Sequence, residues 1–215
     1  MGAGKTTEGK RDASRRRIGG YTVLWFRAEA SKREGEAPTK VVTHDGDILA
    51  DVSPIMIERG HEAEIERICM GQIDRLGHES RVLAVVDEVH FLGTDIVAIL
   101  FRLALIGVEV ECLGLDADFL GRPFPTIRLL REIPEVMTVL VKAVCPACGE
   151  PHATRTLKLI DGIPAGEESP SLQAGNIETG TYTPRCYSCY MKMYSDHGMG
   201  DLPYPRHGST AQGIP

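Results

Sequence analysis

The stretch at residues 81–88, "RVLAVVDE", is a continuous apolar run that ends in two carboxylates. A strand that helices cover on both faces has this composition, because neither of its sides meets water. Further β-type runs and helical patterns alternate along the chain around it. The β-type runs are 21–26, 40–46, 108–115 and 137–145, and the helical patterns are 6–18, 55–76, 93–107 and 126–133. Strands that alternate with helices predict a parallel sheet with right-handed crossovers, so we expect an α/β core.

The stretch "MGAGKTT" at residues 1–7 contains part of a phosphate-binding loop. Gly4, Lys5 and Thr6 fit the end of the pattern G-x-x-x-x-G-K-[ST], which follows a strand and opens a helix. The first glycine of this pattern and its strand would precede Met1. We therefore expect that the natural gene product begins upstream, and that the chain as printed folds poorly or binds ATP weakly. A chance match is the alternative.

Asp87 and Glu88 end the buried run. Beside a phosphate loop, an acid such as Asp87 helps to hold Mg²⁺ together with the hydroxyl of the loop, here Thr6, while Lys5 reaches the β- and γ-phosphates. Glu88 could then deprotonate or orient a nucleophile. The alternative is that both acids are solvated charges at the end of a strand. The combination of loop, acids and alternating elements favours a nucleotide site.

Composition limits the class of protein. A length of 215 residues suffices for one domain, or for one domain and a small module. The net charge of −6 argues against a nucleic-acid-binding protein that relies on overall charge. The sequence predicts neither a membrane span nor a secretory signal. We therefore expect a cytoplasmic protein in a reducing compartment, with no membrane or nucleic-acid partner.

Four of the six cysteines form two C-x₂-C pairs, Cys145 with Cys148 and Cys186 with Cys189. Two such pairs can complete a tetrahedral Zn²⁺ site, and a shell of four cysteines is structural because it leaves no position for water. A long loop must then extend between the pairs. Two unrelated thiol pairs are the alternative. The other cysteines lie in apolar segments and are predicted to be core thiols: Cys69 and Cys112.

The composition changes at residue 144, where cysteine pairs, glycines, prolines and short β-type pieces begin. This change indicates a core at 1–143 and a small second module at 144–193. Residues 194–215 are polar and rich in Gly and Pro, and are predicted to form a disordered tail.

The motifs "GAGKTTE", "DEVHF", "GLDADFLGRPF", "AVCPACG", "RTLKLIDGIPA" and "YTPRCYSC" occur in the order seen in type II thymidine kinases. Nearly all of residues 1–190 resembles this family. The resemblance implies a RecA-like P-loop core with a mostly parallel sheet, followed by a C-terminal zinc ribbon whose long loop, the lasso, closes over the nucleoside. It also implies transfer of the γ-phosphoryl group of ATP to the 5′-hydroxyl of thymidine, which gives dTMP and ADP in nucleotide salvage for DNA synthesis. Structural Zn²⁺, Mg²⁺, a homotetramer and feedback by dTTP are further implications.

The resemblance also assigns site residues. Glu88 is implied as the general base that takes the proton from the 5′-hydroxyl. The residues implied on the side of ATP and Mg²⁺ are Gly2, Ala3, Gly4, Lys5, Thr6, Asp87 and His90, the last at a position where the family usually has Gln. The residues implied to contact thymidine are Met1, Phe91, Phe119, Phe124, Thr156, Gln173, Ala174, Gly175 and Tyr182. The implied zinc ligands are Cys145, Cys148, Cys186 and Cys189. From the sequence alone, His90 is a hydrogen-bonding wall residue with no chemical role.

Two other functions stay open at this point. A P-loop ATPase with a zinc ribbon that acts on nucleic acid would need a basic strand-binding face, which the acidic total charge and the motif "GLDADFLGRPF" disfavour. A zinc-ribbon interaction protein with a catalytically impaired ATP site would follow if the incomplete loop does not bind phosphate. ADP formation that depends on added thymidine separates the kinase from both.

Overall fold

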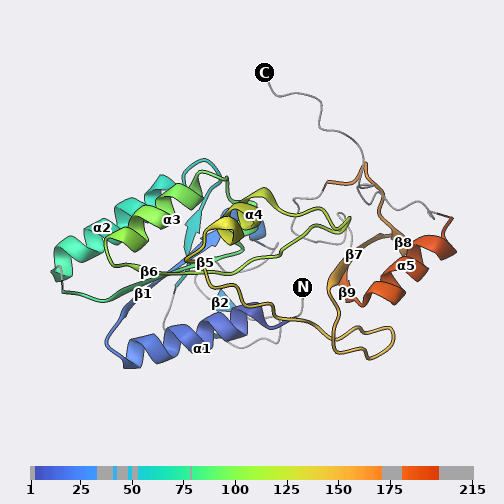
Figure 1. The fold of residues 1–215 in the computed structure, drawn as a ribbon, viewed down its shortest axis with the longest axis horizontal. Helices are drawn as coiled ribbons and strands as arrows, with labels where there is room; N and C mark the ends of the chain where they lie inside the picture. The colour runs from blue at the N-terminus through green and yellow to red at the C-terminus, as the bar shows by residue number, and fades with distance from the viewer. Residues whose placement is uncertain are drawn as a thin grey trace, which may run out of the picture.

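The computed structural model describes residues 3–32, 41–42, 48–49, 53–77, 79–170 and 181–198. Within these residues, a four-stranded parallel sheet carries helices on both faces, and a smaller antiparallel sheet follows it (Figure 1). The predicted α/β class with a small C-terminal module is confirmed. None of the described helices is long and apolar enough to cross a membrane.

The parallel sheet has the strand order β4-β1-β5-β6. In that order, its strands are β4 (Ile55–Ile57), β1 (Thr22–Ala28), β5 (Val82–Asp87) and β6 (Glu109–Cys112). Every residue of β5 is buried, because β1 and β6 pair with its two edges and helices cover its two faces. The carboxyl end of β5 therefore lies in the interior of the sheet, between its neighbours.

One face of the sheet is covered by α1 (Lys5–Ile18). Its Ala13 joins a buried cluster with Trp25 of β1 and with Leu83 and Val85 of β5. Since alternate residues of a strand point to opposite faces, Asp87 at the end of β5 lies on this same face, whereas Val82, Ala84 and Val86 face the other layer.

That other layer contains α2 (Ala63–Leu76), α3 (Ile96–Leu105) and α4 (Pro125–Glu132). Ala84 and Val86 of β5 belong to the larger core cluster, to which all three of these helices contribute. The predicted core thiol Cys69 of α2 is buried in this cluster, and Cys112 of β6 packs against it.

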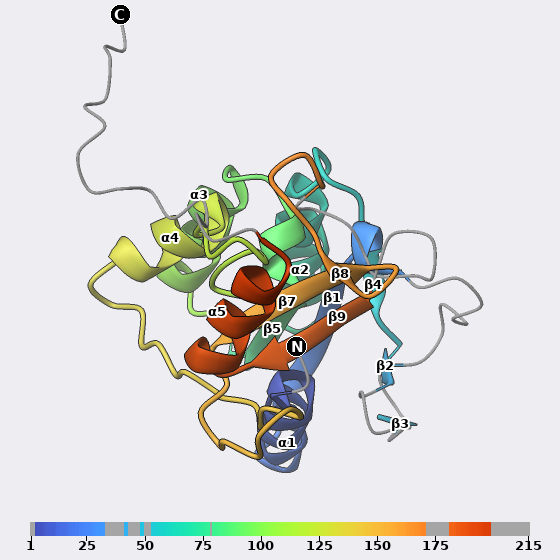
Figure 2. The same cartoon turned by 90° about the vertical axis from the view of Figure 1, so that its right-hand side faces the viewer.

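The C-terminal module consists of a three-stranded antiparallel sheet and one helix (Figure 2). Its elements are β7 (Arg155–Ile160), β8 (Ile163–Pro164), β9 (Thr181–Arg185) and α5 (Tyr187–Asp196), with the strand order β8-β7-β9. The helix packs on the sheet through a buried cluster of Leu157, Tyr190 and Tyr194. A separate antiparallel pair joins β2 (Val41–Val42) to β3 (Ile48–Leu49), so β2 is the described part of the strand predicted at 40–46.

The helix predicted over 55–76 is wrong in its first part. Ile55–Ile57 form a strand that pairs in parallel with the end of β1, and the helix begins only at Ala63. Gly60 between them adopts a positive φ of 95°, which ends the extended segment and which residues other than glycine rarely adopt. Three residues are too few to show the periodicity of a helix or a strand. The structure of Ile55–Ile57 is therefore determined by its pairing with β1.

The last predicted strand, over 137–145, is also wrong. Among the described residues this segment makes only an isolated bridge, between Ala143 and Ala153. Met137 and Val139 are 88% and 74% exposed. A β-type run forms a strand only where another strand satisfies its backbone. Within the described part of the chain this run pairs with no strand, although the outer edge of β6 is open there.

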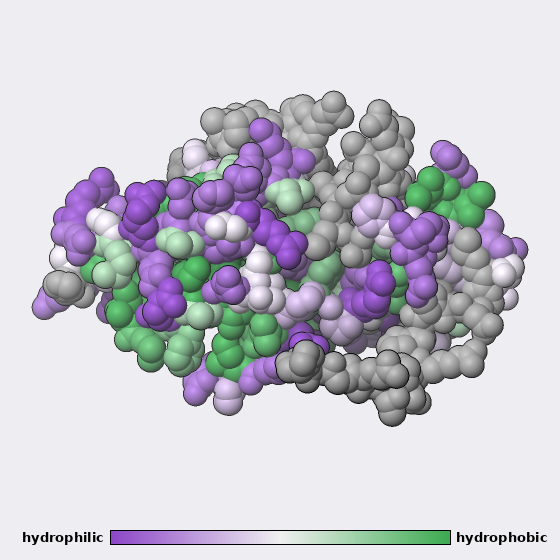
Figure 3. Space-filling model, turned by 90° about the horizontal axis from the view of Figure 1, so that it is seen from above, coloured by the Kyte–Doolittle hydropathy of each residue, from purple (hydrophilic) through white to green (hydrophobic). Residues whose placement is uncertain are grey.

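Apolar side chains reach the surface elsewhere on the core as well. Phe101 and Leu105 of α3 are 45% and 71% exposed. Hydrophobic residues gather on the core half of the molecule, at the left of Figure 3, among strongly polar ones. Such an exposed apolar surface is typical of a face that another protein surface can cover.

Candidate active site and metal centre

The carboxyl end of β5 and the start of α1 bring charged residues together. Asp87, the last residue of β5, is 3% exposed and lies opposite Arg27 of β1 in the sheet register. Burial and the neighbouring Glu88 raise the pKa of Asp87, whereas the charges of Arg27 and Lys5 act to lower it. Lys5 therefore lies close enough to Asp87 for the two charges to interact, as a nucleotide site built from them requires.

The start of α1 has the backbone form expected at the end of a phosphate loop. Gly4 adopts a left-handed conformation, with φ of 80°, directly before Lys5 opens the helix. The first N–H groups of a helix have no partner within the helix and can bind an anionic group. Thr6 lies in this first turn and is half-buried. Lys5 and these backbone groups together can bind a phosphate beside Asp87.

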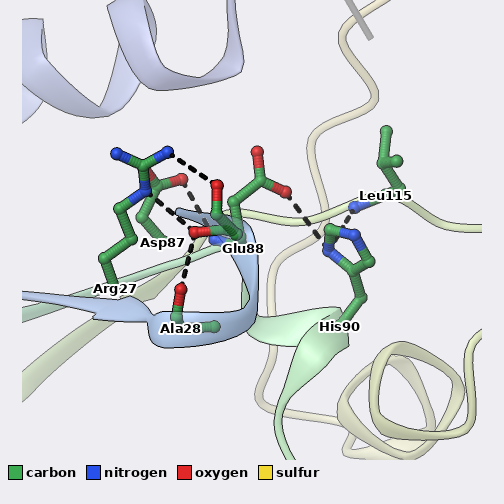
Figure 4. Close-up of polar contacts among 7 residues, drawn as sticks. Arg27, Ala28, Asp87, Glu88, His90 and Leu115 are labelled. Atoms are coloured by element: carbon green, nitrogen blue, oxygen red, sulfur yellow. Dashed lines mark hydrogen bonds and ion pairs between the residues drawn. The ribbon is translucent and has the colours of Figure 1, made fainter. Parts of the chain in front are cut away.

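Glu88 follows β5 in a left-handed backbone conformation, with φ of 54° and ψ of 39°. This conformation is uncommon outside glycine, and hydrogen bonds from two backbone N–H groups hold it. The N–H of Glu88 donates to Oδ1 of Asp87 at 3.0 Å, and the N–H of Val89 donates to the carbonyl of Leu113 at 3.0 Å. Figure 4 shows the result: Asp87 lies beside Arg27, while the carboxylate of Glu88 reaches toward His90. The two acids thus serve different sides of the site.

His90 lies in η2 (Val89–Phe91), and its side chain is buried. The backbone N–H of Leu115 donates to its Nδ1 at 3.3 Å, so the ring proton is assigned to Nε2. Burial lowers the pKa of His90 to about 4, which leaves the ring neutral at pH 7. Its Nδ1 is 3.4 Å from Oε2 of Glu88. His90 is therefore a neutral neighbour of Glu88, not its cationic partner.

The aromatic residues predicted around the nucleoside form two groups. Phe91 and Phe124 flank the ring of His90, with ring centroids 4.3 and 4.7 Å away. Phe119 and Tyr182 belong to a second cluster at the contact between core and C-terminal module. The first group thus lies beside Glu88, and the second joins the two parts of the molecule.

The remaining predicted nucleoside residues are placed only in part. Thr156 lies on β7, half-buried, opposite Pro184 of β9. The other predicted site residues lie outside the described part of the chain: Met1, Gly2, Gln173, Ala174 and Gly175. Most of the predicted tail lies outside it too, whereas α5 extends to Asp196.

The four predicted zinc ligands form one cluster. The sulfur atoms of Cys145, Cys148, Cys186 and Cys189 all lie within 4.8 Å of one another, and those of Cys148 and Cys186 are 3.6 Å apart. Tetrahedral Zn²⁺ with Zn–S bonds of about 2.3 Å needs sulfur atoms roughly 3.8 Å apart, so the arrangement fits this ion. Burial raises the pKa of the Cys145 thiol, but backbone N–H groups of both knuckles outweigh it and lower that pKa. Hydrogen bonds with neighbouring sulfur atoms instead raise the pKa of Cys189, so the arrangement of the four sulfur atoms is what indicates a metal site.

The cysteine cluster also contacts the start of the chain. Cys145 and Cys186 are buried with Ala143 and Ala153, and Ala3 packs against them. The cysteine cluster and the residues that precede α1 are therefore neighbours in the fold.

Two tyrosines of α5 connect the cysteine cluster to the predicted nucleoside pocket. The hydroxyl of Tyr190 donates to the carbonyl of Phe119 at 2.7 Å, and that of Tyr194 donates to the carbonyl of Ala165 at 3.0 Å. Both tyrosines are 2% exposed. Because α5 begins next to Cys186, the cysteine cluster lies at the start of the helix whose tyrosines contact these two carbonyls.

The sequence analysis did not single out Tyr190, Tyr194 or Lys158. The i, i+4 spacing of the tyrosines after the last knuckle indicates one helix face, but it does not name their partners. Lys158 alternates with Leu157 and Leu159 in "RTLKLI", which is the pattern of an exposed polar residue, so the sequence holds no signal of its burial.

A protein-family model described as thymidine kinase matches residues 1–190 of this chain. The match covers most of the sequence, including the phosphate-loop residues, both acids, the aromatic groups and all four cysteines of the cluster.

Proposed function

The chain belongs to the thymidine kinase family, and we propose that Glu88 is the general base with which it phosphorylates thymidine. The protein is an enzyme of nucleotide salvage that transfers a phosphoryl group to thymidine. The orientation of the Glu88 side chain supports this role. Its carboxylate points away from Asp87 and toward the aromatic group around His90. A flat base bound between aromatic side chains would bring its sugar hydroxyl to that side.

The reaction then needs one proton transfer and one displacement. Glu88 accepts the proton of the thymidine 5′-hydroxyl, and the oxygen forms a bond to the γ-phosphorus of ATP. The bond between that phosphorus and the bridging β–γ oxygen breaks, so ADP leaves with the electron pair. Lys5 and the first N–H groups of α1 bind the phosphates and hold them in line.

Asp87 and Thr6 are the residues that would hold Mg²⁺. The donor set fits, since a buried carboxylate beside another acid is stabilised by a cation, and a hydroxyl oxygen is a suitable hard ligand. When bound, Mg²⁺ neutralises charge on the β- and γ-phosphates.

We propose Zn²⁺ in the four-cysteine cluster, with a structural role. All four positions of a tetrahedral ion would be filled by sulfur, and α5 leads from the cluster to the pocket wall. The expected homotetramer, feedback by dTTP and cytoplasmic location stay predictions of the family resemblance.

The test compares Glu88→Gln with the unaltered chain. Because glutamine keeps the shape but cannot accept the proton, we expect kcat to fall by about 10² to 10⁴ while thymidine still binds. ADP formation that depends on thymidine gives kcat, and calorimetry gives thymidine affinity. Glu64→Gln, an exposed position on α2, is the matched control and should keep full activity. Near-normal turnover in Glu88→Gln would assign the base to another residue.

A further inference from the structure

Lys158 is a buried lysine that the proposed mechanism does not use. It lies on β7 and is 1% exposed. Lysine is almost never fully buried without a partner, because removing its ammonium from water is costly. Burial accordingly lowers the pKa of Lys158. Within the described part of the chain no carboxylate forms an ion pair with it, so other groups must compensate for its burial.

Two aromatic faces and one carbonyl surround the ammonium of Lys158. Its Nζ is 5.3 Å from the ring centroid of Phe119 and 5.6 Å from that of Tyr182. Both distances fall within the roughly 6 Å range of a cation–π interaction, which strengthens where water is excluded. Nζ also donates to the carbonyl of Pro170 at 3.1 Å. A single ammonium thus contacts three segments of the chain.

These three segments come from different parts of the fold. Phe119 follows β6 of the core, Tyr182 lies on β9 directly opposite Lys158, and Pro170 follows β8. The same cluster includes Leu120 and Ala165, and the Ala165 N–H donates to the Lys158 carbonyl at 2.9 Å. The buried ammonium of Lys158 therefore contacts both a loop of the core and the C-terminal module.

We propose that Lys158 is a positioning residue for the nucleoside: its ammonium sets the spacing of Phe119 and Tyr182. This inference rests on the proposed function and on the family resemblance, by which Phe119 and Tyr182 contact thymidine. Among the described residues the Tyr182 hydroxyl has no hydrogen-bond partner, and the Phe119 ring can form no such bond, whereas a shared cation attracts both faces at once. The charge is retained because it orders the pocket, and not because it stabilises the fold.

This role predicts a separation of binding from stability. Replacing a buried charged group by an apolar side chain of similar size is often neutral or stabilising. We therefore expect Lys158→Met to keep its thermal midpoint and its zinc while KM for thymidine rises by about tenfold or more, since small displacements of binding groups have large effects. KM for ATP should stay within about twofold, because Lys5 and Asp87 lie in another part of the site.

Two further variants make the experiment decisive. Lys158→Arg keeps a cation that stacks on aromatic rings, so it should recover most of the thymidine affinity. Lys192→Met removes an exposed lysine of α5 and serves as the matched control. Steady-state kinetics, thymidine calorimetry, thermal unfolding and elemental analysis of zinc are measured for all of them.

Three results would overturn the proposal. Unchanged KM for thymidine in Lys158→Met would show that the cation does not position the rings. A lowered thermal midpoint with thymidine and ATP affinities lost together would make its role structural. An equal rise of KM in the Arg and Met variants would exclude the charge as the cause. Failure of the proposed function would appear instead in the unaltered chain, as absence of thymidine-dependent ADP formation, and would overturn both proposals.

Discussion

Glu111 of β6 allows the electrostatics between α1 and the sheet to be tested, because its ionisation should change the stability of the fold. Its side chain lies on the face of the sheet that α1 covers, and its Oε2 is buried and accepts no hydrogen bond from the described residues. Burial and the charge of Asp12 raise the pKa of Glu111 to about 7, although Arg16 acts to lower it. An acid with a raised pKa binds its proton more tightly in the folded chain than in the unfolded one.

The direction of the pH dependence follows from this difference. Below the ordinary pKa of 4.5, both states carry Glu111 protonated. As the pH rises toward 7, the unfolded chain releases the proton first, so the free energy of unfolding falls. A pKa of about 7 instead of 4.5 corresponds to at most roughly 3 kcal/mol. For a chain of this length, that is a shift in the thermal midpoint of at most about 6–12 °C.

Glu111→Gln keeps the shape of the side chain and removes the ionisation. We expect its thermal midpoint to equal that of the unaltered chain near pH 4.5 and to exceed it above pH 7, by up to the shift given above. Thermal unfolding followed by circular dichroism at pH 5 and pH 8 measures the difference, and exposed Glu135→Gln is the control. If Glu111→Gln changes the midpoint equally at both pH values, Glu111 is not a buried acid with a raised pKa.

Two further predictions concern the C-terminal module. Tyr190→Phe leaves the carbonyl of Phe119 without its buried donor, which should cost about 1–3 kcal/mol and raise KM for thymidine more than KM for ATP; an unchanged thermal midpoint would contradict the bond. Cys148→Ser should abolish stoichiometric zinc in elemental analysis and lower the thermal midpoint, because three thiolates leave the tetrahedral shell open; full zinc content in that variant would remove Cys148 from the ligand set.

The parts of the fold that the sequence predicts well are those with strong local signals. The continuous apolar run that became β5 predicts a strand buried on both faces, and the paired knuckles predict the cluster of four sulfur atoms. In both, the residue types alone restrict the structure, because few other arrangements accommodate them. Family motifs then extend these signals to residues such as Glu88.

The features that the sequence did not predict depend on partners distant in the chain. Three residues, Ile55–Ile57, become a strand because they pair with the end of β1, whereas the apolar run at 137–145 pairs with no strand of the described sheet. Likewise, the left-handed backbone of Glu88 is held by the carbonyl of Leu113, and Lys158 is explained by rings from two other segments. Periodicity and propensity contain no information about such partners.

The packing of Ala3 against the cysteine cluster has a consequence for biosynthesis. A ribosome adds about 5–20 residues each second, so Cys186 emerges roughly 10–40 s after Ala3. During that interval the cluster against which Ala3 packs is incomplete, because Cys186 is one of its members. The segment proposed to bind phosphate is thus translated early but completes its packing late, once the second knuckle has left the exit tunnel. Nascent chains still attached to the ribosome would accordingly have little affinity for ATP.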